Sequence, residues 1–158
     1  MVTSNQGSDH PRVAVFPPLF FLVVLIVTLG LHWIAPIAWP WRGVPRWIGW
    51  SLLFGAVALA IWGRIVFARA GTNVSPRRPS TTIVIQGPYR FTRNPMYLGM
   101  SIALVGLALG LHSSWGLVLL PVLVLGLHFG VIVREEAYLE AKFGDSYRAY
   151  RQRVRRWL

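Results

Sequence analysis

The sequence contains no cysteine, and this absence excludes a disulfide framework, a thiol nucleophile and a metal site built on thiolates. Acidic residues are scarce as well, since 5 Asp and Glu stand against 16 Lys and Arg, for a net charge of +11. Charged residues of either sign make up only 13% of the chain, whereas soluble domains carry about 25%. With 54% hydrophobic residues, the composition indicates a membrane protein.

Three long stretches, at 13–41, 47–63 and 94–133, contain no charged residue. A helix needs about 20 mostly apolar residues to cross a membrane, so the first two stretches predict one span each. The third predicts two spans joined by a tight turn at 111–114. The first stretch is too long for the core of a cleaved signal peptide, and we expect it to be retained.

These patterns predict the fold class: an all-α, polytopic membrane protein made of a single domain. The predicted spans are 16–38, 46–68, 95–111 and 114–133, with a connector at 69–94 and amphipathic helices within 134–156.

The basic residues gather in two segments, the connector and the region after the fourth span. The positive-inside rule predicts that both segments, both termini and the active site are cytoplasmic. This placement argues against a nucleic-acid partner and favours attraction of anionic membrane lipids. The connector contains Arg69, Arg77, Arg78, Arg90 and Arg93; the later segment contains Arg134, Arg148, Arg151, Arg153, Arg155 and Arg156; the first connection has only Arg42 and Arg46.

The densest polar stretch, GPYRFTRNPMYLG at 87–99, stands where the third span begins. Within it, Asn94 followed by Pro95 is typical of a helix start, with asparagine as the N-cap. Glu135 and Glu136 stand at the end of the fourth span and are two of the five acidic residues. Taken alone, this pair is as readily explained by solvated carboxylates that offset nearby arginines.

Three motifs, around residues 93–99, 135–139 and 143–154, occur in the same order as in the isoprenylcysteine carboxyl methyltransferases and the related phospholipid N-methyltransferases. The chain resembles these enzymes over roughly residues 81–157. One departure is that Asn94 occupies the position of the family's usual histidine. Asparagine does not titrate near neutral pH, so a general base is excluded at this position, whereas a cofactor-positioning role is not. The matching residues are Arg93, Pro95, Tyr97 and Gly99 in the first motif, Glu135, Glu136 and Leu139 in the second, and Phe143, Gly144, Tyr147, Tyr150 and Val154 in the third.

The resemblance implies S-adenosyl-L-methionine as cofactor, held without the Gly-x-Gly-x-x-Gly turn of a Rossmann domain. We expect Arg93 and the start of the third span to bind its carboxylate, and Glu135 or Glu136 to accept from its ammonium or ribose groups. The expected cofactor-binding residues are Gly87, Pro88, Tyr89, Arg93, Asn94, Tyr97, Leu98, Glu135, Glu136 and Tyr147. The expected catalytic residues are Arg134, Glu135 and Arg153.

No metal is expected, because His32, His112 and His128 lack the spacing of a metal site.

Three functions remain open from the sequence. The first is methyl transfer to a lipid-like or prenylated acceptor, through a carboxylate or an amine. The second is an NADPH-dependent membrane reductase of the sterol-reductase type. The third is a non-enzymatic membrane protein whose basic segments bind lipid or a partner, and this one would tolerate neutral residues at 135 and 136. The identity of the acceptor and the oligomeric state are not encoded in these motifs.

Overall fold

A computed structural model of the protein describes residue 11 and residues 13–40, 43–72 and 79–158. Every regular element in these ranges is helical, which confirms the predicted all-α class. Arg42, Arg77 and Arg78, which contributed to the charge prediction, lie outside the described residues. The elements are α1 (Pro17–Ile34), α2 (Arg46–Arg69), the 3-10 turn η1 (Gly87–Arg90), α3 (Pro95–Leu111), α4 (Ser114–Leu127), the π-helical turn η2 (His128–Ile132), α5 (Val133–Phe143) and α6 (Asp145–Arg153).

Three helices are long and apolar enough to cross a membrane: α1, α2 and the continuous helix Ser114–Phe143 that α4, η2 and α5 form together. The last of these has 30 residues and is therefore about 45 Å long, more than the ~30 Å thickness of the hydrocarbon layer. α3 is apolar but has only 17 residues, and its crossing stays a prediction. α1 ends at Ile34, earlier than predicted, because Ala35 precedes Pro36 and leaves the helical conformation.

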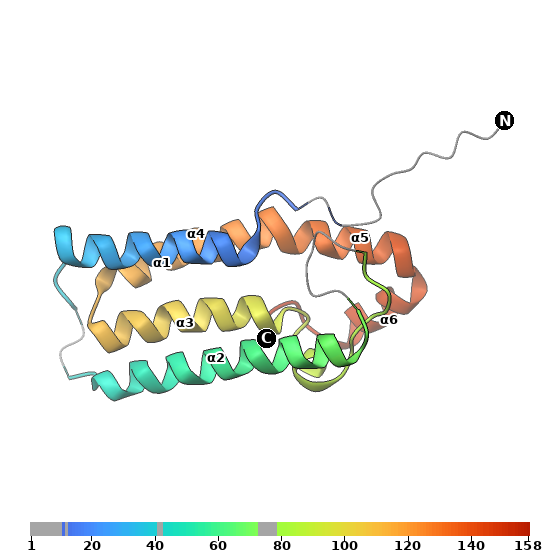
Figure 1. Ribbon diagram of the computed structural model, residues 1–158, viewed down its shortest axis with the longest axis horizontal. Coiled ribbons are helices and arrows are strands. Elements are labelled where there is room, and N and C mark those ends of the chain that lie inside the picture. The colour runs from blue at the N-terminus through green and yellow to red at the C-terminus, as the bar shows by residue number, and fades with distance from the viewer. Residues whose placement is uncertain (1–10, 12, 41–42, 73–78) are drawn as a thin grey trace.

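The helices α1 to α4 run side by side, and α5, α6 and the connector lie together at one end of them (Figure 1). α1 packs against α4, and α3 packs against both α2 and α4. The core sits between α3 and the α4–η2 helix, where Leu104, Leu123, Leu127 and Val131 are fully buried. We call the end that carries α5, α6 and η1 the rim end.

Glycine allows α2 and α3 to approach until their backbones touch. A Cβ added at Gly49 of α2 would overlap the backbone nitrogen of Gly110 and lie 2.6 Å from the carbonyl oxygen of Gly106. A Cβ at Gly106 of α3 would in turn lie 2.6 Å from the backbone nitrogen of Leu53. Such small-residue contacts are the usual means by which membrane helices pack closely.

This close packing fixes the register of the two helices at the rim end. Pro95 and Met96, the first residues of α3, lie beside Gly63 of α2, with side-chain atoms 3.5 Å and 3.3 Å from the position of an added Cβ. α2 continues for six further residues to Arg69, which is an overhang of about 9 Å. η1 packs on this overhang, and the rings of Tyr89 and Phe67 lie 5.3 Å apart between centroids. The overhang therefore provides one wall for the space at the start of α3.

Substituting Gly49 by alanine should destabilise the fold, because the new methyl group meets backbone atoms of α3 that cannot move independently. We expect a cost of at least about 1–3 kcal/mol, seen as a lower midpoint of thermal unfolding in detergent by circular dichroism. Gly55 of the same helix is the matched control, since nothing lies within 4 Å of its added Cβ. Equal midpoints for Gly49→Ala and Gly55→Ala would contradict the packing described here.

Candidate functional site

A hollow at the rim end is enclosed by segments that are far apart in the sequence. Its walls come from the overhang of α2, the connector, the first turn of α3, and the facing sides of α5 and α6. One side is apolar and the other carries charged and phenolic groups. The lining residues are Phe67, Ser80, Thr82, Ile83, Val84, Tyr89, Arg93, Asn94, Pro95, Met96, Tyr97, Glu135, Glu136, Leu139, Tyr147 and Tyr150.

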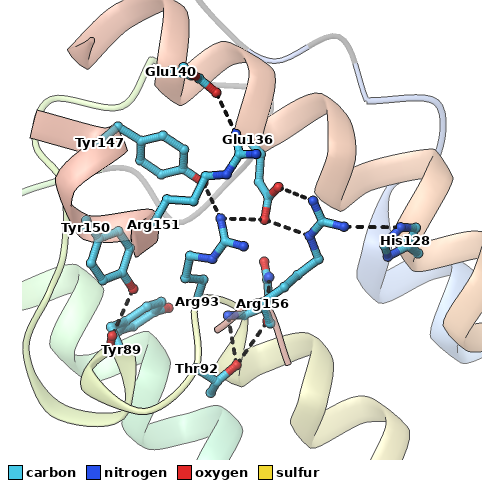
Figure 2. A network of polar contacts seen from close by, with 11 residues as sticks. Tyr89, Thr92, Arg93, His128, Glu136, Glu140, Tyr147, Tyr150, Arg151 and Arg156 are labelled. Carbon is cyan, nitrogen blue, oxygen red and sulfur yellow. Dashed lines mark hydrogen bonds and ion pairs between the residues drawn. The ribbon is translucent and has the colours of Figure 1, made fainter. Parts of the chain in front are cut away.

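Glu136 is the electrostatic centre of the polar side, and it is only 7% exposed. One carboxylate oxygen lies 3.0 Å from Nη1 of Arg93 and 3.0 Å from Nε of Arg156, while the other accepts from Nη2 of Arg156 at 2.6 Å. Figure 2 shows the carboxylate between the two guanidinium groups, with His128 beyond Arg156 at 3.5 Å. A buried carboxylate is tolerated here because both of its oxygens are paired with cations.

The segment 154–158 is bound to the loop that precedes α3. The backbone N–H of Arg93 donates to the carbonyl oxygen of Arg155 at 3.0 Å, and Thr92 Oγ1 donates to that of Arg156 at 3.2 Å. Asn94 Nδ2 donates to the same Arg156 oxygen at 2.9 Å. The expectation that the Asn94 side chain caps α3 is therefore wrong: it stands at the N-cap position but bonds to segment 154–158. The first turn of α3 thus has no side-chain cap among the described residues.

Glu135 differs from its neighbour because no cation is paired with it in the described part of the chain. Its one hydrogen bond comes from the hydroxyl of the buried Tyr97, at 2.9 Å. It lies on α5, after the fourth span predicted at 114–133. Burial raises the pKa of Glu135 to about 7, the nearby charge of Glu136 adds to this, and the Tyr97 hydrogen bond opposes it. The hollow therefore contains a carboxyl group that changes its charge near neutral pH.

Two further polar atoms on residues that line the hollow are buried and have no hydrogen-bond partner: the Tyr89 hydroxyl and Nε of Arg93. The backbone of Tyr89 is fixed separately, since its carbonyl oxygen accepts from the Tyr150 hydroxyl at 2.8 Å. An unpaired buried polar group costs about 1–3 kcal/mol. A polar ligand that offered partners to these atoms would recover part of that cost.

The structure brings most of the sequence-predicted binding residues to one place, but not all of them. Tyr89, Arg93, Asn94, Tyr97, Glu135, Glu136 and Tyr147 line the hollow. Gly87, Pro88 and Leu98 do not line it, and neither do Arg134 and Arg153, which are exposed. Gly87 instead packs against α2, where an added Cβ would lie 2.8 Å from Val66.

Some contributors were missed by the sequence analysis. Arg156 was expected to contact lipid, as one of a run of arginines, and nothing local distinguishes it from the exposed Arg155. Tyr150 belongs to the third motif, and that match was the signal available for it. The apolar wall formed by Phe67, Val84 and Met96 has no sequence signature, because it depends on the packing of α2, the connector and α3.

Replacing Arg156 by glutamine should leave Glu136 buried with one cation instead of two. Hydrogen bonds to charged groups contribute about 1.5–3 kcal/mol, so we expect a loss of that order in the free energy of unfolding. Arg155→Gln removes the same charge from an exposed neighbour and should change stability little. Denaturant titrations of both variants measure the difference, and equal stabilities would show that Arg156 does not hold Glu136.

Comparisons with known proteins agree with the resemblance in the motifs. A family model described as phospholipid methyltransferase matches residues 44–146, well over half of the chain. An uncharacterised protein of Haemophilus influenzae is 44% identical over 63 residues, which are 40% of this chain and all of that protein. The protein-S-isoprenylcysteine O-methyltransferase of Schizosaccharomyces pombe is 34% identical over 80 residues, which are 51% of this chain. This alignment spans only 34% of that enzyme's length. No solved structure matches.

The matched region runs from just before α2 into α6, and it includes both Arg93 and Glu136. Together with the apolar helices, the match indicates a membrane methyltransferase. The chain belongs to the phospholipid methyltransferase family.

Proposed function

We propose that the protein transfers a methyl group from S-adenosyl-L-methionine to a lipid-borne acceptor at the cytoplasmic face of the membrane. The observation that carries this proposal is the hollow between the start of α3 and the start of α5. It joins a cation, tyrosines and a carboxyl group that the described residues do not pair with a cation, and two buried polar atoms on residues that line it have no partner among the described residues. Family membership supports the reaction type, and the position at the rim end supports a membrane-borne acceptor.

The residues of the hollow fit the cofactor. Arg93 and the uncapped first turn of α3 suit a carboxylate, since a helix N-terminus and a guanidinium both favour anions. Glu135 suits an ammonium group or ribose hydroxyls, whereas Glu136 is already saturated by two arginines. Glu135 is therefore the carboxylate that remains available to accept hydrogen bonds from the cofactor. This narrows the expectation from the sequence, which allowed either Glu135 or Glu136 in that role.

The tyrosines provide the remaining surface. Tyr89, Tyr147 and Tyr150 line the hollow and can pack against a flat base or a sulfonium cation. When bound, S-adenosyl-L-methionine supplies an electrophilic methyl group. The protein's part is to align the acceptor, to exclude water and to hold a proton. Alignment of two reactants can by itself lower a barrier by about 7–11 kcal/mol.

The acceptor would reach the apolar wall of the hollow, formed by Phe67, Val84 and Met96. A carboxylate acceptor needs no base. An amine acceptor must lose a proton, and Glu135 is placed to accept it. Arg134 and Arg153, exposed at the rim end, are proposed to hold an acidic headgroup or a carboxylate acceptor.

The two alternatives receive less support. The family match gives no support to an NADPH-dependent reductase. A purely lipid-binding protein would not need a hollow in which buried polar atoms lack partners.

Incubating membranes that contain the protein with methyl-labelled cofactor should label a lipid fraction, and the labelled fraction identifies the acceptor. An unlabelled lipid fraction would count against the proposal.

S-adenosylhomocysteine should bind the detergent-purified protein with measurable heat, and NADPH should not. Tyr89→Phe should weaken this binding about 2–10-fold, the value of one hydrogen bond, without lowering the stability of the free protein. The free energy of unfolding should not fall, because the Tyr89 hydroxyl makes no hydrogen bond to the described residues that the substitution could remove. Arg155→Gln is the control, since Arg155 is exposed and does not line the hollow. Absence of heat with S-adenosylhomocysteine would overturn the assignment of the cofactor.

The binding of S-adenosylhomocysteine should depend on pH through Glu135. Below its pKa of about 7 the carboxyl group is neutral, and above it the group is ionised and attracts the ligand's ammonium. The affinity should therefore rise as the pH increases from about one unit below this pKa to about one unit above. Glu135→Gln should remove the rise, leaving a weak affinity that is independent of pH. An unchanged slope in the variant would assign the dependence to another group.

A further inference from the structure

Two large apolar side chains are exposed on the connector, one on each side of η1. Ile85 is 54% exposed and Phe91 is 69% exposed. Neither lines the hollow, although Ile83 and Val84 do. Ile83 and Val84 border both the hollow and a second groove beside the end of α2, whereas Ile85 borders that groove and not the hollow.

The connector folds back along the outer side of α2. The left-handed φ of +58° at Gly87 allows the chain to turn there, with the side chains of Val66 and Trp62 against it. Ile85 borders a shallow groove together with Val66, Arg69 and Ala70. η1 thus lies beside the last two turns of α2, where the charge-free stretch of that helix ends.

The exposed surface of α2 at this level is largely apolar, with Arg64 exposed among the apolar side chains. Ile61, Trp62 and Ile65 are all exposed, and they belong to the helix that is long enough to span the membrane. Ile85 borders the groove beside Val66 and Arg69 and so continues this apolar surface, while Phe91 is exposed on the other side of η1. This continuity identifies the bilayer as their partner in preference to another protein.

The charges nearby fit the same partner. Arg64, Arg69 and Arg90 are exposed at the rim end, and the connector contains no acidic residue. Apolar side chains bordered by arginines are typical of segments that lie in the membrane interface, with the apolar groups buried about 5–10 Å deep. Each arginine near an anionic surface contributes about 1 kcal/mol.

We propose that Ile85 and Phe91 insert into the boundary between lipid headgroups and acyl chains, so that the connector is an interfacial anchor for a bilayer that contains anionic lipid. Irregular backbone is tolerated at this depth because it rests on protein, and the N–H groups of Tyr89, Phe91 and Arg93 are bonded to carbonyl oxygens within the protein. The insertion itself is independent of the chemistry. Its consequence, which rests on the proposed function, is that the connector segment carrying Ile83 and Val84 holds the hollow beside the lipid boundary, where an acceptor arrives.

The absence of cysteine makes a direct measurement of depth possible. Ile85→Cys and Phe91→Cys are each labelled with a nitroxide in vesicles of phosphatidylcholine and phosphatidylglycerol. Power saturation then compares the accessibility of the label to oxygen, which partitions into lipid, with its accessibility to a water-soluble nickel chelate. Phe54→Cys on the exposed face of α2 is the lipid reference, and Ala149→Cys on the exposed side of α6 is the aqueous reference.

Labels at 85 and 91 should favour oxygen over the nickel chelate, with a depth between the two references. Accessibility equal to that at 149 would overturn the proposal, as would a label shielded from both reagents, which would indicate a protein partner. Binding of S-adenosylhomocysteine to the same variants separates this proposal from the previous one. Normal binding with aqueous labels rejects the anchor alone, whereas inserted labels without binding reject the methyl-transfer site alone.

Discussion

The pairing of one buried carboxylate with two guanidinium groups holds the candidate site together. Glu136 comes from α5, Arg93 from the loop before α3, and Arg156 from the segment after α6, so one ionic cluster joins three parts of the chain. Withdrawing a carboxylate from water costs several kcal/mol, and only both cations together with their hydrogen bonds offset this cost. The cluster therefore forms only when all three segments are in place, and the hollow forms with it.

The hollow arises from helix packing, without a β-sheet among the described residues. Backbone contact between Gly49 and Gly110 fixes the register of α2 and α3, and this register leaves the end of α2 standing beyond the start of α3. The connector can then pack on the overhang and bring Tyr89 toward Arg93. Packing within the helix bundle thus decides how much room exists at its rim end.

Much of the fold could be predicted from the sequence, because helices that cross lipid must be long, apolar and nearly free of charged residues. The charge-free stretches predicted α2 and the bounds of α3, and Pro36 explains why α1 stops early. The residues of the candidate site are harder to predict from the sequence than the helices are. Motif resemblance located Arg93, Glu135 and Glu136, whereas the partners of Asn94 and Arg156 depend on how segment 154–158 packs against a distant loop. No local pattern distinguishes an arginine that faces lipid from one that pairs with a buried glutamate.

The π-helical turn η2 has a consequence for the two adjacent glutamates. A π turn accommodates one residue more than a regular α turn, and each residue of a helix is rotated by about 100° from the next. If η2 relaxed to α geometry, every later side chain would move forward by one position. Glu135 would then occupy the place of Glu136 between the arginines, and Arg134 would enter the hollow. The phase of this single turn therefore places Glu136 between the arginines and Glu135 in the hollow, where the described residues give it no cation partner.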